Sequence, residues 1–135
     1  MTYSLTREQF LDALESGKYI KATGTTLEVD VNGNICHCAL GVAMAEAGIK
    51  YKEEKIEWED HLFRKRSRTQ ITWDLKDEDW EEDSRFSFIP DDLALSLEID
   101  VEEEDFIWNE NDADQKESFI DLAKKLRERW NIPKV

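Results

Sequence analysis

The sequence has no apolar run long enough to span a membrane. Its beginning, MTYSLTREQF, has neither the basic start nor the apolar centre of a signal peptide. It contains only two cysteines, Cys36 and Cys38, and a disulfide between residues so close in the chain would be strained. We therefore expect a soluble cytoplasmic protein whose cysteines are free thiols.

Basic residues are scarce in one stretch, residues 69–110, which holds 2 Lys or Arg against 16 Asp or Glu. This segment alone carries a formal charge of −14, equal to that of the whole chain. Such a field repels nucleic acid and membrane surfaces and attracts basic partners. The basic cluster RKRSR at 64–68 is too small to reverse this. We therefore expect neither direct nucleic-acid binding nor membrane binding.

The chain does contain the material for a hydrophobic core. Of its 135 residues, 40% are apolar, and five Trp, six Phe and three Tyr supply large side chains. A chain of this length buries roughly two-thirds of the surface that it exposes when unfolded. With no internal repeat and no low-complexity linker, it is predicted to form a single domain over residues 1–135.

Two helices and a hairpin are predicted in the first 50 residues. Thr6 and Gln9 have the spacing of a capping box, and the amphipathic helix that they begin should end at Gly17. Residues 25–31 alternate between apolar and polar, which predicts a strand that leads through a two-residue turn at Asn32-Gly33 into a short second strand. From Cys38 to Ala47 the sequence has almost no polar residue, which predicts a helix buried on nearly all sides.

The second half of the chain is less regular. Residues 55–75 favour a short helix followed by a strand through Ile71 and Trp73. FSFIP predicts another strand, and Pro90 suits the first turn of the helix that follows it. The acidic residues 100–105 are expected to form a solvated loop.

An amphipathic helix is predicted near the C-terminus, over residues 114–130, with Asp114 as its N-cap and Glu117 three residues on. Asn111 and Asp112 would form the turn before it. The predicted fold is therefore α+β, with a small antiparallel sheet, a buried central helix and a C-terminal amphipathic helix.

Several of these segments resemble a family of small phage and bacterial proteins of unassigned function. In that family an ALRSGKY helix end precedes a CCLGVLC helix and then an LND…F…IA helix. Here FLDALESGKY, CALGVAMAEAG and NENDADQKESFIDLAKKL occur in the same order. Residues that match are Cys38, Leu40, Gly41, Val42, Asn111, Asp112, Phe119, Leu122 and Ala123. Ala39 and Met44 stand where the family often has further cysteines. The resemblance implies a phage or mobile-element setting.

One alternative function is a Cys38-dependent hydrolase or transferase. A thiol at a helix N-terminus can be acidified by the helix dipole. Either His37 or His61 could act as its base, and Asp112 or Asn111 could orient that base. Against this, the surroundings of Cys38 are apolar, and no glycine loop that could bind an oxyanion adjoins it. We expect Cys38 to be a buried structural thiol, with no catalytic residue.

The soft metal ligands in the chain are Cys36, His37, Cys38 and His61. Zinc requires four ligands, and His37 would point away from its two neighbours on an extended segment. We therefore predict no metal site and no cofactor.

The leading hypothesis from the sequence is a non-enzymatic binding protein with an acidic, aromatic-studded face for a basic protein surface. A phage-encoded inhibitor that occupies the nucleic-acid channel of a host enzyme is one version, with carboxylates in place of phosphates. A third possibility is a small-ligand-binding domain whose acidity serves solubility. The predicted partner-binding residues are Asp74, Asp77, Asp79, Trp80, Glu81, Glu82, Asp83, Glu102, Glu103, Glu104 and Trp108.

Overall fold

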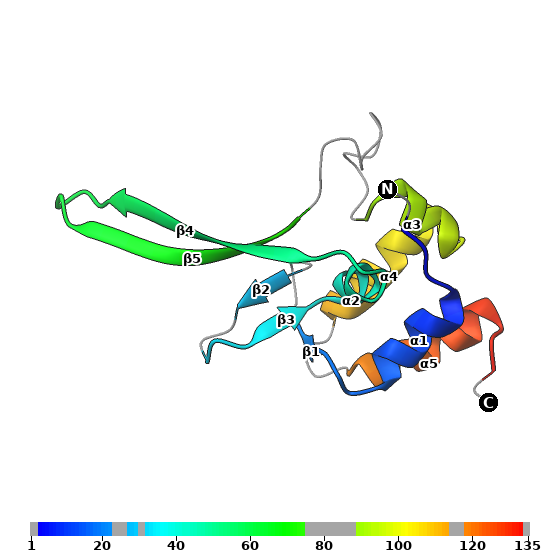
Figure 1. Ribbon diagram of the computed structural model, residues 1–135. Coiled ribbons are helices and arrows are strands. Elements are labelled where there is room, and N and C mark those ends of the chain that lie inside the picture. Colours follow the sequence, from blue (N-terminus) through cyan, green and yellow to red (C-terminus); the bar gives the residue numbers. More distant parts are fainter. Residues whose placement is uncertain (1–2, 23–26, 30–31, 75–88, 114–117, 134–135) are drawn as a thin grey trace.

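Helices and two small sheets form an α+β fold in the computed structural model, which describes residues 3–22, 27–29, 32–74, 89–113 and 118–133 (Figure 1). The helices are α1 (Arg7–Glu15), α2 (Ala39–Glu46), α3 (Asp91–Ser96), α4 (Val101–Ala113) and α5 (Phe119–Trp130). The strands are β1 (Ile20–Lys21), β2 (Leu27–Val29), β3 (Ile35–His37), β4 (Tyr51–Glu59) and β5 (Lys65–Trp73).

Helix α2 is buried at the centre of the body, as its sequence predicts. Leu40, Val42 and Met44 are almost completely shielded from solvent, although they point in different directions around the helix. The helix contacts α1, α4 and β3, and the core extends from it to α3 and α5. Because α2 has no polar face, it has to be covered on all of its sides.

The N-terminal helix begins and ends as predicted. The Thr6 hydroxyl accepts a hydrogen bond from the Gln9 N–H, and the Gln9 side chain accepts one from the Thr6 N–H. Gly17 follows the helix with φ +75°, a conformation that glycine adopts without steric cost. Thr6 and Gln9 therefore determine where α1 begins, and Gly17 determines where it ends.

The three-stranded sheet has the order β1-β3-β2. Strands β2 and β3 form the predicted antiparallel pair, but Val29 lies opposite Ile35, which is inconsistent with a two-residue turn at Asn32-Gly33. That turn would have placed Val29 opposite Cys36. Strand β1 was not predicted, and it pairs parallel to β3, so this sheet is mixed rather than purely antiparallel.

Two predictions in the second half of the chain were wrong. The acidic residues expected to form a loop instead begin α4, where the Glu103 N–H donates to Asp100 Oδ1 at 2.9 Å. Acidic side chains stabilise the first turn of a helix because its free N–H groups carry partial positive charge. Asn111 and Asp112 also belong to α4, rather than to a turn.

The last helix starts later than predicted. Ser118 caps α5 in a capping box with Asp121, and Asn131 ends the helix in the left-handed conformation. The predicted cap pair, Asp114 and Glu117, lies outside the described residues. The amphipathic face itself was predicted correctly, because Phe119, Leu122, Ala123 and Leu126 are all buried.

The largest difference concerns residues 51–73, which form one long antiparallel hairpin in which β4 pairs with β5 along the full length of both strands. The predicted strand through Ile71 and Trp73 is confirmed as part of β5, whereas the predicted short helix is wrong. The hairpin projects from the body as an arm (Figure 1). Every residue of β4 except the half-buried Ile56 is exposed, and only Ile56 and Trp58 alternate with charged residues, which is a weak signal for a half-buried strand.

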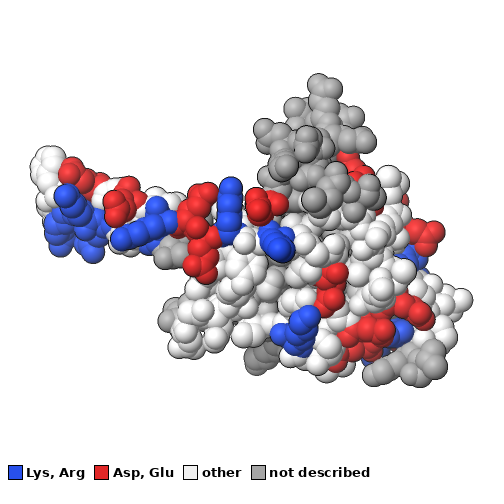
Figure 2. Space-filling model, viewed as in Figure 1, with Lys and Arg blue, Asp and Glu red and all other residues white. Residues whose placement is uncertain are grey.

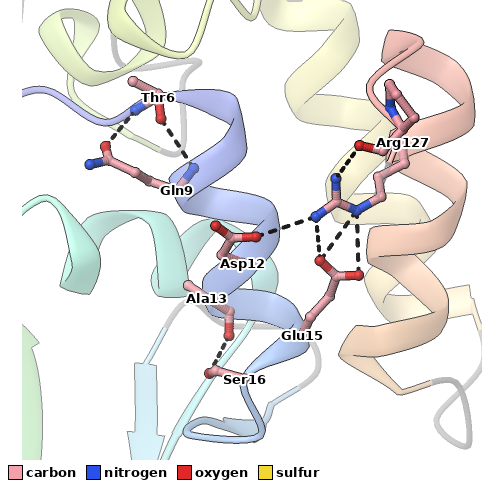
Figure 3. A network of polar contacts seen from close by, with 8 residues as sticks. Thr6, Gln9, Asp12, Ala13, Glu15, Ser16 and Arg127 are labelled. Carbon is pink, nitrogen blue, oxygen red and sulfur yellow. Dashed lines mark hydrogen bonds and ion pairs between the residues drawn. The ribbon is translucent and has the colours of Figure 1, made fainter. Parts of the chain in front are cut away.

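Arg127 joins the two terminal helices, which pack side by side (Figure 3). Its guanidinium donates to both carboxylate oxygens of Glu15 and also reaches Asp12 at 3.4 Å. The Arg127 and Glu15 side chains are mostly buried, at 11% and 13% exposed. A bidentate ion pair that is mostly buried stabilises the fold more than an ion pair exposed to solvent does.

We expect Arg127→Ala to lower the free energy of unfolding by about 2 kcal/mol, since it leaves Glu15 half-buried without its charged donors. Lys125→Ala is the matched control on the same helix. The Lys125–Glu110 pair is more exposed, and its loss should cost less than about 1 kcal/mol. Urea unfolding followed by circular dichroism measures both. Equal losses in the two variants would contradict the structural role of Arg127.

Candidate interaction surface

The Cys36-His37-Cys38 stretch lies where β3 runs into α2, and both thiols are free and buried. Cys38 is the N-cap residue of α2 and is 1% exposed. Burial raises the pKa of its thiol to about 11, and this outweighs the opposing effect of the N–H groups at the helix N-terminus. At neutral pH the Cys38 sulfur is therefore a protonated thiol inside the core, rather than a nucleophile.

The residues of the thiol-enzyme alternative are not assembled into a site. Asp112 is near enough to Cys38 for its charge to raise the thiol pKa further, which is the wrong direction for a nucleophile. His61 lies in the turn at the tip of the arm, far from α2 (Figure 1). His61 is therefore out of reach of the sulfur as a base.

Asn111 has a structural role that its sequence context did not reveal. Its side chain is 1% exposed, and its Oδ1 accepts from the Ala39 N–H at 3.1 Å while its Nδ2 donates to the Ala22 carbonyl at 2.9 Å. One side chain thus satisfies both a free N–H in the first turn of α2 and the carbonyl of the residue that follows β1. The sequence signal, an Asn in a polar run, is equally typical of a turn.

His37 lies against two aromatic rings at the base of the arm. The Tyr19 ring meets it edge-on at 5.1 Å between centroids, and the Trp73 ring, at the end of β5, is 5.9 Å away. His37 Nδ1 is buried and has no hydrogen-bond partner among the described residues. Burial lowers the pKa of His37, so the imidazole is neutral where it packs.

The described residues contain no group of three or more His, Cys, Asp or Glu side chains arranged to hold a metal ion. In the same part of the chain, no helix is long and apolar enough to cross a membrane.

The predicted acidic face is only partly within the described residues, because Asp77, Asp79, Trp80, Glu81, Glu82 and Asp83 lie outside them. Of the described members, Asp74 and Glu102 are exposed. Glu104 is only 2% exposed, so it cannot contribute to a surface, and Trp108 is half-buried against the core. Glu103 accepts from Arg129 and from the Trp130 indole, and the Arg129 bond holds the Glu103 pKa below its usual value.

The arm has two chemically different faces, because paired residues in an antiparallel ladder lie on the same side of the sheet. Ile56 pairs with Arg68 and Trp58 pairs with Arg66, which places two arginines beside two apolar side chains. The Arg68 guanidinium lies 6.0 Å from the centre of the Trp58 ring. We call this side of the distal arm, defined by these four residues, the arginine face.

Asp60 organises the tip of the arm. Its Oδ1 accepts from the backbone N–H groups of Leu62 and Arg64, at 2.9 and 3.0 Å, and its Oδ2 accepts from Nε of Arg64 and Arg66, at 3.0 and 3.1 Å. The Arg64 N–H is the main cause of a lowered Asp60 pKa. The basic run therefore pairs within the hairpin, not with acidic loops elsewhere.

Phe63 stands at the end of this turn with φ +60°, in the left-handed region. A three-residue hairpin loop commonly ends in such a residue, but glycine usually occupies the position. A bulky residue there costs roughly 1–2 kcal/mol. The Phe63 side chain is 83% exposed and Leu62 beside it is 57% exposed, so neither burial nor packing in this fold offsets that cost.

No known protein-family model, curated protein or solved structure matches this chain. The resemblance inferred from its short motifs therefore remains a prediction, and the structural observations carry the functional argument.

We expect both cysteines of the native protein to react slowly with iodoacetamide near neutral pH and rapidly after unfolding in urea. The reason for Cys38 is its burial and its raised pKa. Mass spectrometry of quenched samples measures the rates. Fast alkylation of native Cys38 would support the thiol-enzyme alternative instead.

Acidification should destabilise the fold through His37. Because burial lowers its folded-state pKa, the unfolded chain binds a proton more readily, so stability falls as pH drops below about 6.5. The free energy of unfolding, measured in urea between about pH 7.5 and 5.5, should decrease less in His37→Phe than in the wild type. An unchanged slope in His37→Phe would contradict this account.

Proposed function

We propose that this chain is a non-enzymatic binding protein that engages another macromolecule through the tip of its β4–β5 arm. One observation carries the proposal: Phe63, in an unfavourable backbone conformation, is exposed at the end of an arm that projects from the body. Strained backbone that contributes nothing to packing is characteristic of functional sites.

Other features of the arm support the same role. A two-stranded hairpin alone is only marginally stable in water, and the distal part of this one projects from the body, although β5 also contacts β2 (Figure 1). Its exposed side chains include Trp58, Leu62 and Phe63, near Arg66 and Arg68. Tryptophan and arginine are the residue types most enriched at the energetic centres of protein interfaces.

The proposal keeps the binding function expected from the sequence and assigns it to a different surface. An inhibitor role for a phage-encoded chain is one version of it, in which the arm tip would occupy a functional surface of a host protein. The acidic segment could still attract a basic partner, and its central part, residues 75–88, lies outside the described residues.

Substituting Phe63 should separate stability from binding. We expect Phe63→Gly to raise the free energy of unfolding by about 1 kcal/mol, because glycine relieves the left-handed strain. The same variant should lose the partners that the tagged wild type retains from a host extract, identified by mass spectrometry. Leu95→Gln, which removes an equally exposed apolar side chain from α3, is the matched control and should retain them. Identical partner sets for all three proteins would overturn the proposal.

A further inference from the structure

We infer that the arm tip docks into an apolar pocket of a partner protein, and that carboxylates border this pocket. The inference rests on the proposed binding function and adds the chemical class of the partner. The net charge of the chain predicts a basic partner, whereas this pocket is acidic.

The tip is the cationic part of an acidic molecule. Residues 58–68 hold four Lys or Arg against two Asp or Glu, in a chain whose formal charge is −14. Figure 2 shows cationic side chains along one side of the outer part of the arm and acidic side chains along the other, where the arm extends away from the body. The local charge at the tip therefore favours an anionic partner.

The arm is long enough to separate the charge of the tip from the charge of the body. Nine residues of β4 span about 30 Å, whereas charges in physiological salt are screened over about 8 Å. A partner that contacts Phe63 therefore meets the field of the tip much more than the field of the acidic residues on α3 and α4. The net charge governs approach from a distance, and the tip governs the docked state.

The side chains at the tip suit a pocket in a protein more than a nucleic acid. Two large apolar side chains, Leu62 and Phe63, are exposed at the tip, and the four cations of residues 64–68 follow them in the chain. Asp60 already accepts from Arg64 and Arg66, so its carboxylate would lie among the phosphates of a docked nucleic acid. Aromatic anchors with charges of both signs around them are typical of protein interfaces.

The tip is also held ready for docking. The four hydrogen bonds to Asp60 fix the loop that carries Phe63, and the Phe63 N–H donates to the Asp60 carbonyl at 2.9 Å. A loop that is already ordered loses little conformational entropy when it binds. Arg68, which lies over Trp58 and is not held by Asp60, is the arginine best placed to pair with a partner carboxylate.

The test begins with photo-crosslinking at the anchor. A benzoylphenylalanine at position 63 of the full chain should crosslink to a protein in host extract, and the same residue at position 95 should not. The contact mapped by mass spectrometry should be an apolar site bordered by Asp or Glu. The crosslinked protein is then purified, and its affinity for the unmodified chain is measured by calorimetry.

A charge reversal distinguishes the acidic partner from other partners. Arg68→Glu should weaken the measured affinity roughly tenfold, with a loss that shrinks as salt is raised. Lys124→Glu makes the same charge change at an exposed position on α5, and it should alter the affinity by less than about twofold. A partner that binds Arg68→Glu as tightly as the wild type, or more tightly, overturns the acidic pocket but leaves the binding function intact.

Two defined probes test the other anionic classes. Phosphatidylserine vesicles and a short DNA duplex are each titrated with the wild type and with Phe63→Gly. Phe63-dependent binding to either one, without any protein crosslink at position 63, overturns this inference while supporting a binding arm. If position 63 crosslinks no more than position 95 and neither probe binds, both the inference and the proposed function fail.

Discussion

The need to cover α2 on every side determines the arrangement of the body. Six consecutive buried residues, 39–44, have no polar side chain and cannot lie at a surface, so α1, α4 and β3 pack directly around this helix, and the shared core extends to α3 and α5. The terminal helices then meet each other, and the Arg127–Glu15 pair holds them together. The packing of the terminal helices α1 and α5 therefore depends on the core around α2.

Polar side chains inside this core stabilise the packing of neighbouring elements and do not form a reactive site. Asn111 satisfies backbone groups of two separate elements, and His37 packs as a neutral ring between Tyr19 and Trp73. Burial that stabilises these contacts also raises the pKa of Cys38. The same physical cause, removal from water, makes the cysteine–histidine stretch structural and disfavours its use in catalysis.

The arm follows the opposite rule from the body. Its strands bury little of their own surface, and its tip keeps a phenylalanine exposed at a backbone conformation that costs free energy. Trp73 at the end of β5 packs on His37, so the base of the arm is anchored in the core while the distal part extends into solvent. A stable body with a projecting recognition element can gain or change partners without altering its core.

The sequence by itself determined the elements whose signals are local. The capping box of α1, the all-apolar α2 and the amphipathic α5 follow from side chains within a few residues of one another. Only the tertiary structure decided the rest. In β4 only Ile56 and Trp58 alternate with charged residues and almost every side chain is exposed, so the strand is recognised only through its pairing with β5. Asn111 likewise takes its role from neighbours distant in the chain, because burial depends on which surfaces the fold brings together, and no single segment encodes that.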